Sequence, residues 1–248
     1  MNLAADKVHV WFAYAQLLDD ASVRARFEAL LSADERERRD RMKFERGRRE
    51  QLLTRGMLRE LLSLYSTQTA PAAWRFVHGE SGRPSLAPPF DATGLHFNVA
   101  HSDGLVAVAV GRMPHLGVDV ESESRKVNLS VAERYFSAGE VASLQALPPQ
   151  HQPRLFLRLW TLKEAYLKAT GTGVAGGLGS MSFRLLQDGV IDFQRDDDPH
   201  AKRWLFREFN PPGYVLALAC LDTAAQFPAQ ARLHEYRAHS GQEQRTQA

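Results

Sequence analysis

The sequence predicts an α+β protein, because patterns typical of strands and patterns typical of helices both occur in each half of its 248 residues. Val8, Val10, Phe12 and Tyr14 alternate with their neighbours, and a side-chain period of two is typical of a strand. Leucines at helical spacing within residues 51–65 indicate a helix. Clusters of glycine, proline, serine and asparagine separate segments of both kinds and predict the turns between them.

The first half continues with helices and then with short strands. Residues 21–31 are expected to form a helix, and Ser32 with Glu35 forms the capping-box pattern that begins another. In this pattern the hydroxyl and the carboxylate three residues later each accept a backbone N–H bond, so it marks a helix start. Strands are expected at residues 74–77, 95–100, 105–110 and 116–120, with turns at 82–84 and 102–104.

The second half has the same kinds of element. Ser137 and Glu140 form another capping box, so Glu140 is expected to begin a helix rather than to bind a ligand. A helix is expected at 155–170, with Gly171 as its left-handed end residue. Further strands are expected at 182–186, 190–193, 204–209 and 214–220. We expect an N-terminal half at 1–121, a C-terminal half at 122–238 and a disordered polar tail at 239–248.

Composition excludes several classes of protein. The formal net charge of +2 gives no strong field for nucleic acid. The single cysteine, Cys220, excludes an internal disulfide. Residues 1–7 lack the basic and apolar regions of a signal peptide, and no stretch is long and apolar enough to span a bilayer. We therefore expect a cytoplasmic protein that binds neither nucleic acid nor membrane.

Two carboxylates stand at the end of a predicted strand, in the sequence Gly117-Val118-Asp119-Val120-Glu121. Because strand side chains alternate between faces, Asp119 and Glu121 point to the same side. Two carboxylates on one face repel each other unless a cation lies between them, and paired hard oxygens suit Mg²⁺. Taken alone, such a pair is more often a solvated strand end.

A second stretch runs from Trp160 to Lys168 at helical spacing. Glu164 and Lys168 are four residues apart and share a helix face, and Trp160 and Lys163 lie close to it. Taken alone, a Glu and a Lys at this spacing form a surface ion pair of a few tenths of a kcal/mol, of the order usually measured on helices. Together, the two stretches supply three carboxylates and two lysines, which suggests a metal ion and a phosphate.

Two more segments, Ser81-Gly82-Arg83-Pro84 and Phe97-Asn98-Val99-Ala100-His101-Ser102, complete a pattern of four motifs. In this order and spacing the motifs resemble those of the 4′-phosphopantetheinyl transferases, in their Sfp-type monomeric branch, over residues 8–220. The chain departs from the family pattern twice. Arg83 replaces a lysine and offers a planar fork in place of a point charge. Ala100 replaces a serine, so any contact there must come from the backbone.

The resemblance implies a fold, a reaction and a metal site. It implies two similar α+β halves related by a pseudo-twofold axis, with the active site between them, in a monomer. The enzyme is expected to move the 4′-phosphopantetheine arm of coenzyme A to a serine of an apo acyl or peptidyl carrier protein, releasing 3′,5′-ADP. Mg²⁺, or Mn²⁺, is expected on Asp119, Glu121 and Glu164. Glu164 and Lys168 are the expected catalytic residues. Lys168 is also an expected phosphate contact, and Lys163 is either a second contact or part of a structural ion pair.

The resemblance also implies a clamp on the 3′-phosphate of coenzyme A within the basic stretch 36–49. Arg46 is the first candidate and Arg38 the second, because an arginine fork matches phosphate geometry. Arg83 adds charge over the nucleotide, Ala100 contributes backbone, and His101 donates ring N–H groups to a phosphate.

Three questions stay open at this stage. The first is whether Glu164 or a water held by the metal removes the serine proton. A carboxylate on Mg²⁺ loses basicity, so Glu164 is not the only candidate. The second is an alternative function, a Mg²⁺-dependent phosphohydrolase that would use the same carboxylates on another diphosphate and would need no protein acceptor. A non-catalytic module that binds carrier proteins needs no intact acid–lysine helix, so the complete stretch from Trp160 to Lys168 argues against it.

Overall fold

The computed structural model describes residues 1, 3–79, 82–173, 177–221 and 230–237, which form helices and sheets that are antiparallel except for one parallel pair, so the α+β prediction is confirmed. The chain divides into two compact units, Met1–Arg112 with Gln230–Ala248, and Met113–Ala229. The expected boundary after Glu121 therefore falls inside the second unit, and the chain returns to the first unit near its end. The expected tail, 239–248, lies outside the described residues.

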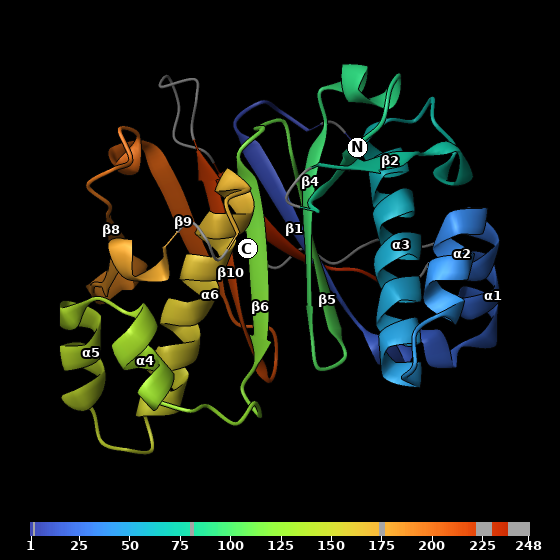
Figure 1. The fold of residues 1–248 in the computed structure, drawn as a ribbon. Coiled ribbons are helices and arrows are strands. Elements are labelled where there is room, and N and C mark those ends of the chain that lie inside the picture. Colours follow the sequence, from blue (N-terminus) through green and yellow to red (C-terminus); the bar gives the residue numbers. More distant parts are fainter. Residues whose placement is uncertain (2, 80–81, 174–176, 222–229, 238–248) are drawn as a thin grey trace. The chain divides into compact units, whose positions relative to one another are not determined.

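The first unit is a sheet covered by helices. Its helices are α1 (Ala21–Leu30), α2 (Ala33–Asp40) and α3 (Glu45–Tyr65), and its strands are β1 (Lys7–Tyr14), β2 (Phe76–His78), β3 (Pro84–Leu86), β4 (His96–Ser102), β5 (Leu105–Gly111) and β11 (Gln230–Glu235). Four strands form one sheet in the order β11-β1-β5-β4, in which β11 pairs parallel to β1. Helix α3 packs against β4 and β5, with α1 and α2 on its outer side (Figure 1).

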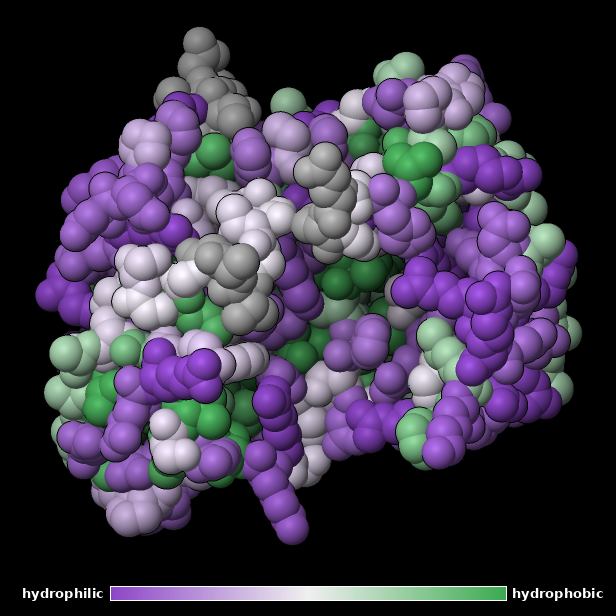
Figure 2. All heavy atoms as spheres, in the orientation of Figure 1, coloured by the Kyte–Doolittle hydropathy of each residue, from purple (hydrophilic) through white to green (hydrophobic). Residues whose placement is uncertain are grey.

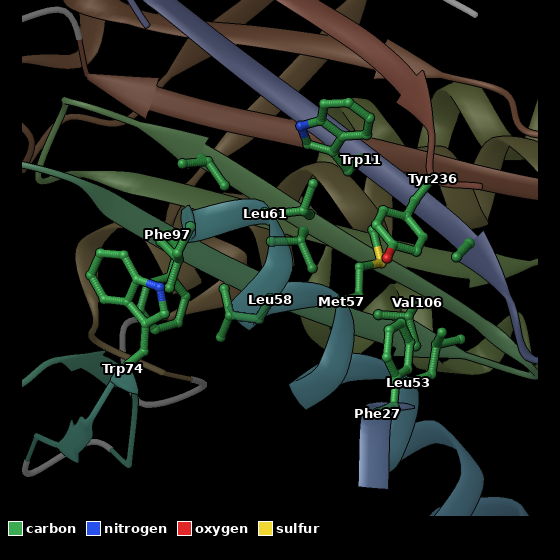
Figure 3. Close-up of a cluster of buried hydrophobic side chains, with 14 of the residues drawn as sticks. Trp11, Phe27, Leu53, Met57, Leu58, Leu61, Trp74, Phe97, Val106 and Tyr236 are labelled. Atoms are coloured by element: carbon green, nitrogen blue, oxygen red, sulfur yellow. The ribbon is translucent and has the colours of Figure 1, made fainter. Parts of the chain in front are cut away.

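The core of the first unit lies between α3 and the sheet. Its buried side chains include Leu53, Met57, Leu58 and Leu61 of α3, Phe27 of α1, Val106 of β5, and Trp11, Trp74, Phe97 and Tyr236 (Figure 3). The outer face over α1 and α2 is largely hydrophilic (Figure 2). The helix-spaced leucines predicted from sequence are thus the face that α3 buries, at about 25 cal/mol per Å² of apolar surface.

The second unit is also a sheet with a long helix against it. Its helices are α4 (Ser130–Tyr135), α5 (Ala138–Gln145) and α6 (Gln152–Thr170), and its strands are β6 (Leu116–Ser122), β7 (Ser182–Leu185), β8 (Ile191–Gln194), β9 (Trp204–Phe209) and β10 (Tyr214–Leu221). The main sheet has the order β6-β10-β9. Helix α6 packs against β6 and β10, and its core residues include Leu159, Leu162 and Tyr166.

The order of elements is the same in both units. Each begins with a strand and continues with two short helices, a long one, a small two-stranded hairpin and two strands of the main sheet, after which the first unit adds β11. The first unit has β1-β5-β4 side by side, and the second has β6-β10-β9. The letters of the sequence show no such repeat.

The short sequence patterns that mark helix starts and ends agree with the structure, whereas no pattern indicated which strands pair across distant parts of the chain. Both predicted capping boxes are confirmed, at Ser32 with Glu35 and at Ser137 with Glu140. Gly171 ends α6 with a φ of 75°. Strands β3 and β11 and helix α4 were not predicted. None of the helices among the described residues is long and apolar enough to cross a membrane.

Candidate functional site

A close approach of helix α6 to strand β6 creates the first part of the site. Gly117 lies on β6 facing α6, and a Cβ atom added there would lie 2.0 Å from the carbonyl oxygen of Ala165 and 2.5 Å from the nitrogen of Ala169. Only glycine allows two backbones to come so near. The helix residues Glu164 and Lys168 therefore lie beside the carboxylates that follow Gly117 on the strand.

Asp119 is the most constrained of these carboxylates. It is only 8% exposed, and its Oδ1 accepts a hydrogen bond of 2.7 Å from Lys168 Nζ. Its other oxygen, Oδ2, is buried and has no hydrogen-bond partner among the described residues. Burial raises the pKa of Asp119, and the positive charge of Lys168 opposes that rise. A buried carboxylate oxygen without a partner is costly, so this atom is suited to a bound cation.

Glu164 and Glu121 complete a group that we call the carboxylate cluster, namely Asp119, Glu121 and Glu164 with Lys168. Glu164 is half-buried, and no described residue forms a hydrogen bond or an ion pair with its side chain. Burial raises the pKa of Glu164, and the negative charge of Asp119 raises it further. Glu121 is largely buried and forms an ion pair with Arg125.

The residues of the carboxylate cluster fit a divalent cation by their chemistry. All three acids offer hard oxygens, and burial raises the pKa of both Asp119 and Glu164, so a cation would stabilise their charged forms. In the part of the chain that the structure describes, no three metal-binding side chains already converge on one point. Lys168 and Arg125 hold two of the acids instead, so a metal ion must replace part of their contacts.

Lys163 lies apart from this cluster, inside the second unit. Its side chain is fully buried, and its Nζ lies 2.9 Å from Glu140 Oε2 and donates to the carbonyl oxygens of Leu178 and Met181 at 2.8 and 2.7 Å. An ammonium has three donors, and these three contacts use them all. The expectation that Lys163 contacts coenzyme A is therefore corrected: its geometry is that of a structural ion pair, the alternative that the sequence left open.

We expect Lys163→Met to lower stability without changing substrate binding. Removing one partner of a buried ion pair costs about 3–5 kcal/mol, because Glu140 is left charged and unpaired. Urea unfolding measures this loss, and the exposed Lys126→Met is a matched control that should change little. A variant with parental stability and a raised KM for coenzyme A would restore Lys163 as a ligand contact.

In the first unit, Glu50 of α3 organises the residues near the β4–β5 turn. Its side chain is buried, and it accepts from the backbone N–H of Gly104 at 3.0 Å. Its carboxylate also lies 3.1 Å from Arg46 Nε and 3.4 Å from His101 Nδ1. Arg46 is exposed and pairs further with Asp103 at 2.7 Å. Arg46 is thus held by two carboxylates, which already satisfy much of its charge.

A cavity of about 270 Å³ lies next to His101, and we call it the histidine cavity. Arg38, Gln51, Thr54, Arg55 and His101 line it, as do Gly82 and Pro84 on either side of Arg83. The Arg38 side chain forms no hydrogen bond or ion pair with any described residue. Arg46 is not among the lining residues. The structure therefore brings together Arg38 and His101 with Glu50, which also lines the cavity, while Arg46 lies outside the lining and pairs with Glu50 and Asp103.

Two further predicted contacts lie beside this cavity. Arg83 is half-buried, and burial lowers its pKa. Ala100 is buried in β4 and pairs with Ala107 of β5, so its methyl group offers no polar contact, as the departure from the family pattern implied.

Sequence reasoning missed several residues that shape the site. Gly117 carried a usable signal, because a glycine inside a strand often marks a close backbone approach. Glu50 and Arg125 carried none, since each is an ordinary charged residue whose partner is fixed only by the folded chain. Nothing in the sequence indicated that Arg55, one arginine within a helix, would line the histidine cavity.

Comparison with known proteins gives consistent findings. Residues 115–219 match the 4′-phosphopantetheinyl transferase superfamily. The 4′-phosphopantetheinyl transferase HetI of Nostoc sp. is 37% identical over 71% of this chain and 73% of its own length. The 4′-phosphopantetheinyl transferase psf-1 of Bacillus pumilus is 31% identical over 85% of this chain and 88% of its own length. The 4′-phosphopantetheinyl transferase Sfp of Bacillus subtilis is 31% identical over 78% of this chain and 83% of its own length.

Proposed function

Because this chain belongs to the 4′-phosphopantetheinyl transferase family, we propose that the carboxylate cluster and the histidine cavity serve one transfer reaction. The enzyme moves the 4′-phosphopantetheine arm of coenzyme A to a serine of an apo carrier protein and releases 3′,5′-ADP. The observation that carries the proposed site is the buried, unpartnered Oδ2 of Asp119 beside Lys168.

The roles within the carboxylate cluster follow from charge. Asp119, Glu121 and Glu164 are the residues that would hold Mg²⁺, or Mn²⁺, and the bound ion would neutralise charge on the pyrophosphate. Lys168 is an ammonium on a half-buried stem, held 2.7 Å from Asp119 Oδ1. If a cation contacted Asp119 in place of Lys168, the Lys168 ammonium could contact the phosphate that is transferred. Positioning and charge neutralisation are the main sources of rate in such transfers.

Glu164 is the proton acceptor in this proposal. Burial and the neighbouring Asp119 raise its pKa, and a higher pKa makes a carboxylate a better base near neutral pH. No described residue forms a hydrogen bond or an ion pair with the Glu164 side chain, so it is available to take the serine proton directly or through a water that the metal would hold. The serine oxygen attacks the pyrophosphate phosphorus on the pantetheine side, the bond from that phosphorus to the bridging oxygen breaks, and 3′,5′-ADP leaves.

The histidine cavity is the proposed place of the nucleotide. Arg38 and His101 line it together, and an arginine without an ion pair is better suited to a phosphate than one held by two carboxylates. We therefore assign the 3′-phosphate to Arg38 in place of the first sequence candidate, Arg46. Arg83 adds positive charge at the turn, and the Ala100 segment offers backbone only.

The larger arrangement belongs to the same proposal. The shared order of elements in the two units supports two similar halves, and one substrate that needs residues of both implies a site that both complete. A monomer in the cytoplasm, as the sequence predicts, is tested by light scattering and by cell fractionation. Acyl and peptidyl carriers are both expected acceptors.

Incubation of an apo carrier protein with coenzyme A and Mg²⁺, followed by intact mass, tests this function. The carrier mass rises by the mass of the phosphopantetheine arm, and chelation of the metal prevents the rise. Breakdown of coenzyme A with no change in carrier mass would show a phosphohydrolase. Carrier binding with neither product would show a binding module.

For Glu164→Gln we expect coenzyme A to bind normally and the transfer rate to fall by about 10²–10⁴-fold, the usual range for a positioned base. Rates are measured against Mg²⁺ concentration at saturating coenzyme A. If the main task of Glu164 is to hold the metal, raised Mg²⁺ recovers much of the rate. The exposed Glu133→Gln on α4 is the control, and a Glu164→Gln rate equal to it at every Mg²⁺ level would remove both roles.

Arg38 and Arg46 are separated by comparing coenzyme A with dephospho-coenzyme A, which lacks the 3′-phosphate. We expect Arg38→Gln to weaken coenzyme A by about tenfold to a hundredfold, because a charge-assisted contact contributes about 1.5–3 kcal/mol. Its affinity for dephospho-coenzyme A should stay unchanged. Arg46→Gln should affect neither ligand in this selective way, and the reverse pattern in a calorimetric titration would return the role to Arg46.

A further inference from the structure

The first unit contains a second and larger cavity, of about 660 Å³. It lies where the end of α1 and the start of α2 meet the short helix η2 (Pro71–Ala73) and strand β2. We call it the arginine cavity, after Arg36, Arg38, Arg55, Arg59 and Arg75, which line it together with His78. Its volume lies within the range of about 300–1,000 Å³ that is typical of small-molecule sites.

The charge of this cavity is unbalanced. Five arginines line it, against the two carboxylates Asp34 and Glu35. Glu35 is buried and serves two guanidinium groups, at 2.8 Å from Arg59 and 3.5 Å from Arg55. Arg59 is only 1% exposed and the Arg55 side chain 12%. One carboxylate between two buried cations leaves excess positive charge, which at Arg59 is offset only by the carbonyl oxygens of Pro71, Ala72 and Trp74, and an anion would stabilise it.

A buried donor at the same place also lacks a partner. Arg59 donates through one terminal nitrogen to the carbonyl oxygen of Trp74 at 2.8 Å and through the other to Glu35. Its Nε is buried and has no hydrogen-bond partner among the described residues. The cations also act on one another, since burial, Arg38 and Arg59 lower the pKa of Arg55, while burial, Arg55 and Arg38 lower that of His78.

Apolar side chains also line part of the cavity, beside Ser32, Asp34 and Glu35. The guanidinium carbons of Arg55 and Arg59 lie 5.3 and 5.2 Å from the centre of the Phe76 ring, and Leu30 and Leu31 line the cavity too. Arginine forks match the oxygens of a phosphate, and an aromatic ring with leucines suits an organic body. We propose that the arginine cavity is a second anion site, distinct from the histidine cavity, that binds the phosphate group of a small molecule.

The position of the arginine cavity links it to the transfer reaction. Arg38, Arg55 and His78 line both cavities. An anion in the arginine cavity neutralises charge that also attracts the nucleotide, so it weakens coenzyme A binding. Free phosphate then acts as an inhibitor that competes with coenzyme A. This consequence rests on the proposed function, but the anion site itself does not.

Inorganic phosphate is the probe, followed by phosphorus-31 NMR at constant ionic strength. We expect saturable binding to the parent protein, and binding about tenfold weaker or more in Arg75→Gln, which alters a residue of the arginine cavity only. Arg36→Gln should act in the same way and replaces Arg75→Gln if that variant melts early. Arg41→Gln, on an exposed arginine paired with Glu37, should bind like the parent.

Three results would overturn the proposal. One is phosphate binding that is absent or not saturable. Another is phosphate binding lost in His101→Ala, which alters the histidine cavity only, and kept in Arg75→Gln. The third is a raised KM for coenzyme A in Arg75→Gln without phosphate, because coenzyme A itself would then occupy the arginine cavity. If no transfer occurs at all, the phosphate titration still decides the site.

Discussion

Asp119→Asn should abolish transfer, with kcat/KM lower by about 10³-fold or more. The change keeps the shape of the side chain but removes the charge that faces a cation and Lys168. Charge stabilisation by a bound metal contributes several kcal/mol, and about 1.4 kcal/mol is tenfold in rate. The rate is measured by carrier mass over time at saturating Mg²⁺. Parental transfer by this variant would make the strand end an ordinary solvated edge.

The same variant should be no less stable than the parent without metal. Because burial raises the pKa of Asp119, the folded protein holds this proton more tightly than the unfolded chain does. The stability that comes from that proton is present at acidic pH and is lost as pH rises through the raised pKa, so the charged form opposes folding at neutral pH. Asparagine mimics the neutral form. We expect an equal or higher Tm at pH 7, with the difference fading toward acidic pH.

Gly117→Ala should damage both stability and rate. The added Cβ would meet the α6 backbone at 2.0 and 2.5 Å, so the helix has to shift away from β6. Forcing extra volume into a packed contact costs about 1–3 kcal/mol. A shift of about 1 Å in Glu164 and Lys168 lowers the rate by roughly 10²-fold, because the reacting groups lose their alignment.

The control for Gly117→Ala is Gly139→Ala in α5. Open space surrounds a Cβ at Gly139, and the backbone there is helical, so alanine should be neutral or slightly stabilising. Urea unfolding and transfer rates of the two variants give the comparison. If Gly117→Ala keeps parental stability and rate, the close approach of α6 to β6 is not what positions the carboxylate cluster.

The elements that the sequence predicted well are those with a local signature. Capping boxes at Ser32 and Ser137, the alternation in β1 and the leucines of α3 each depend on a few neighbouring residues. Strand β11 shows the limit of such signals. It pairs parallel to β1 across more than two hundred residues of sequence, and nothing near Gln230 specifies that partner. The return of the chain to the first unit could not be predicted for this reason.

The carboxylate cluster was predicted for a related reason. A strand period and a helix period place Asp119 with Glu121 and Glu164 with Lys168, and the family resemblance joins the two pairs. The partners of charged residues were not predictable. Lys163 has the same letters around it as a ligand lysine, but burial beside Glu140 gives it another task. Arg46 and Arg38 differ only in which carboxylates the fold places beside them.

We propose that the buried Oδ2 of Asp119 is a ligand of the catalytic cation, and Mn²⁺ binding tests this assignment. Electron paramagnetic resonance counts bound Mn²⁺ in the presence of coenzyme A, for the parent and for Asp119→Asn. We predict one bound Mn²⁺ per parent chain, in competition with Mg²⁺, and a large loss of affinity in the variant. Equal Mn²⁺ affinity in the two proteins would contradict the account.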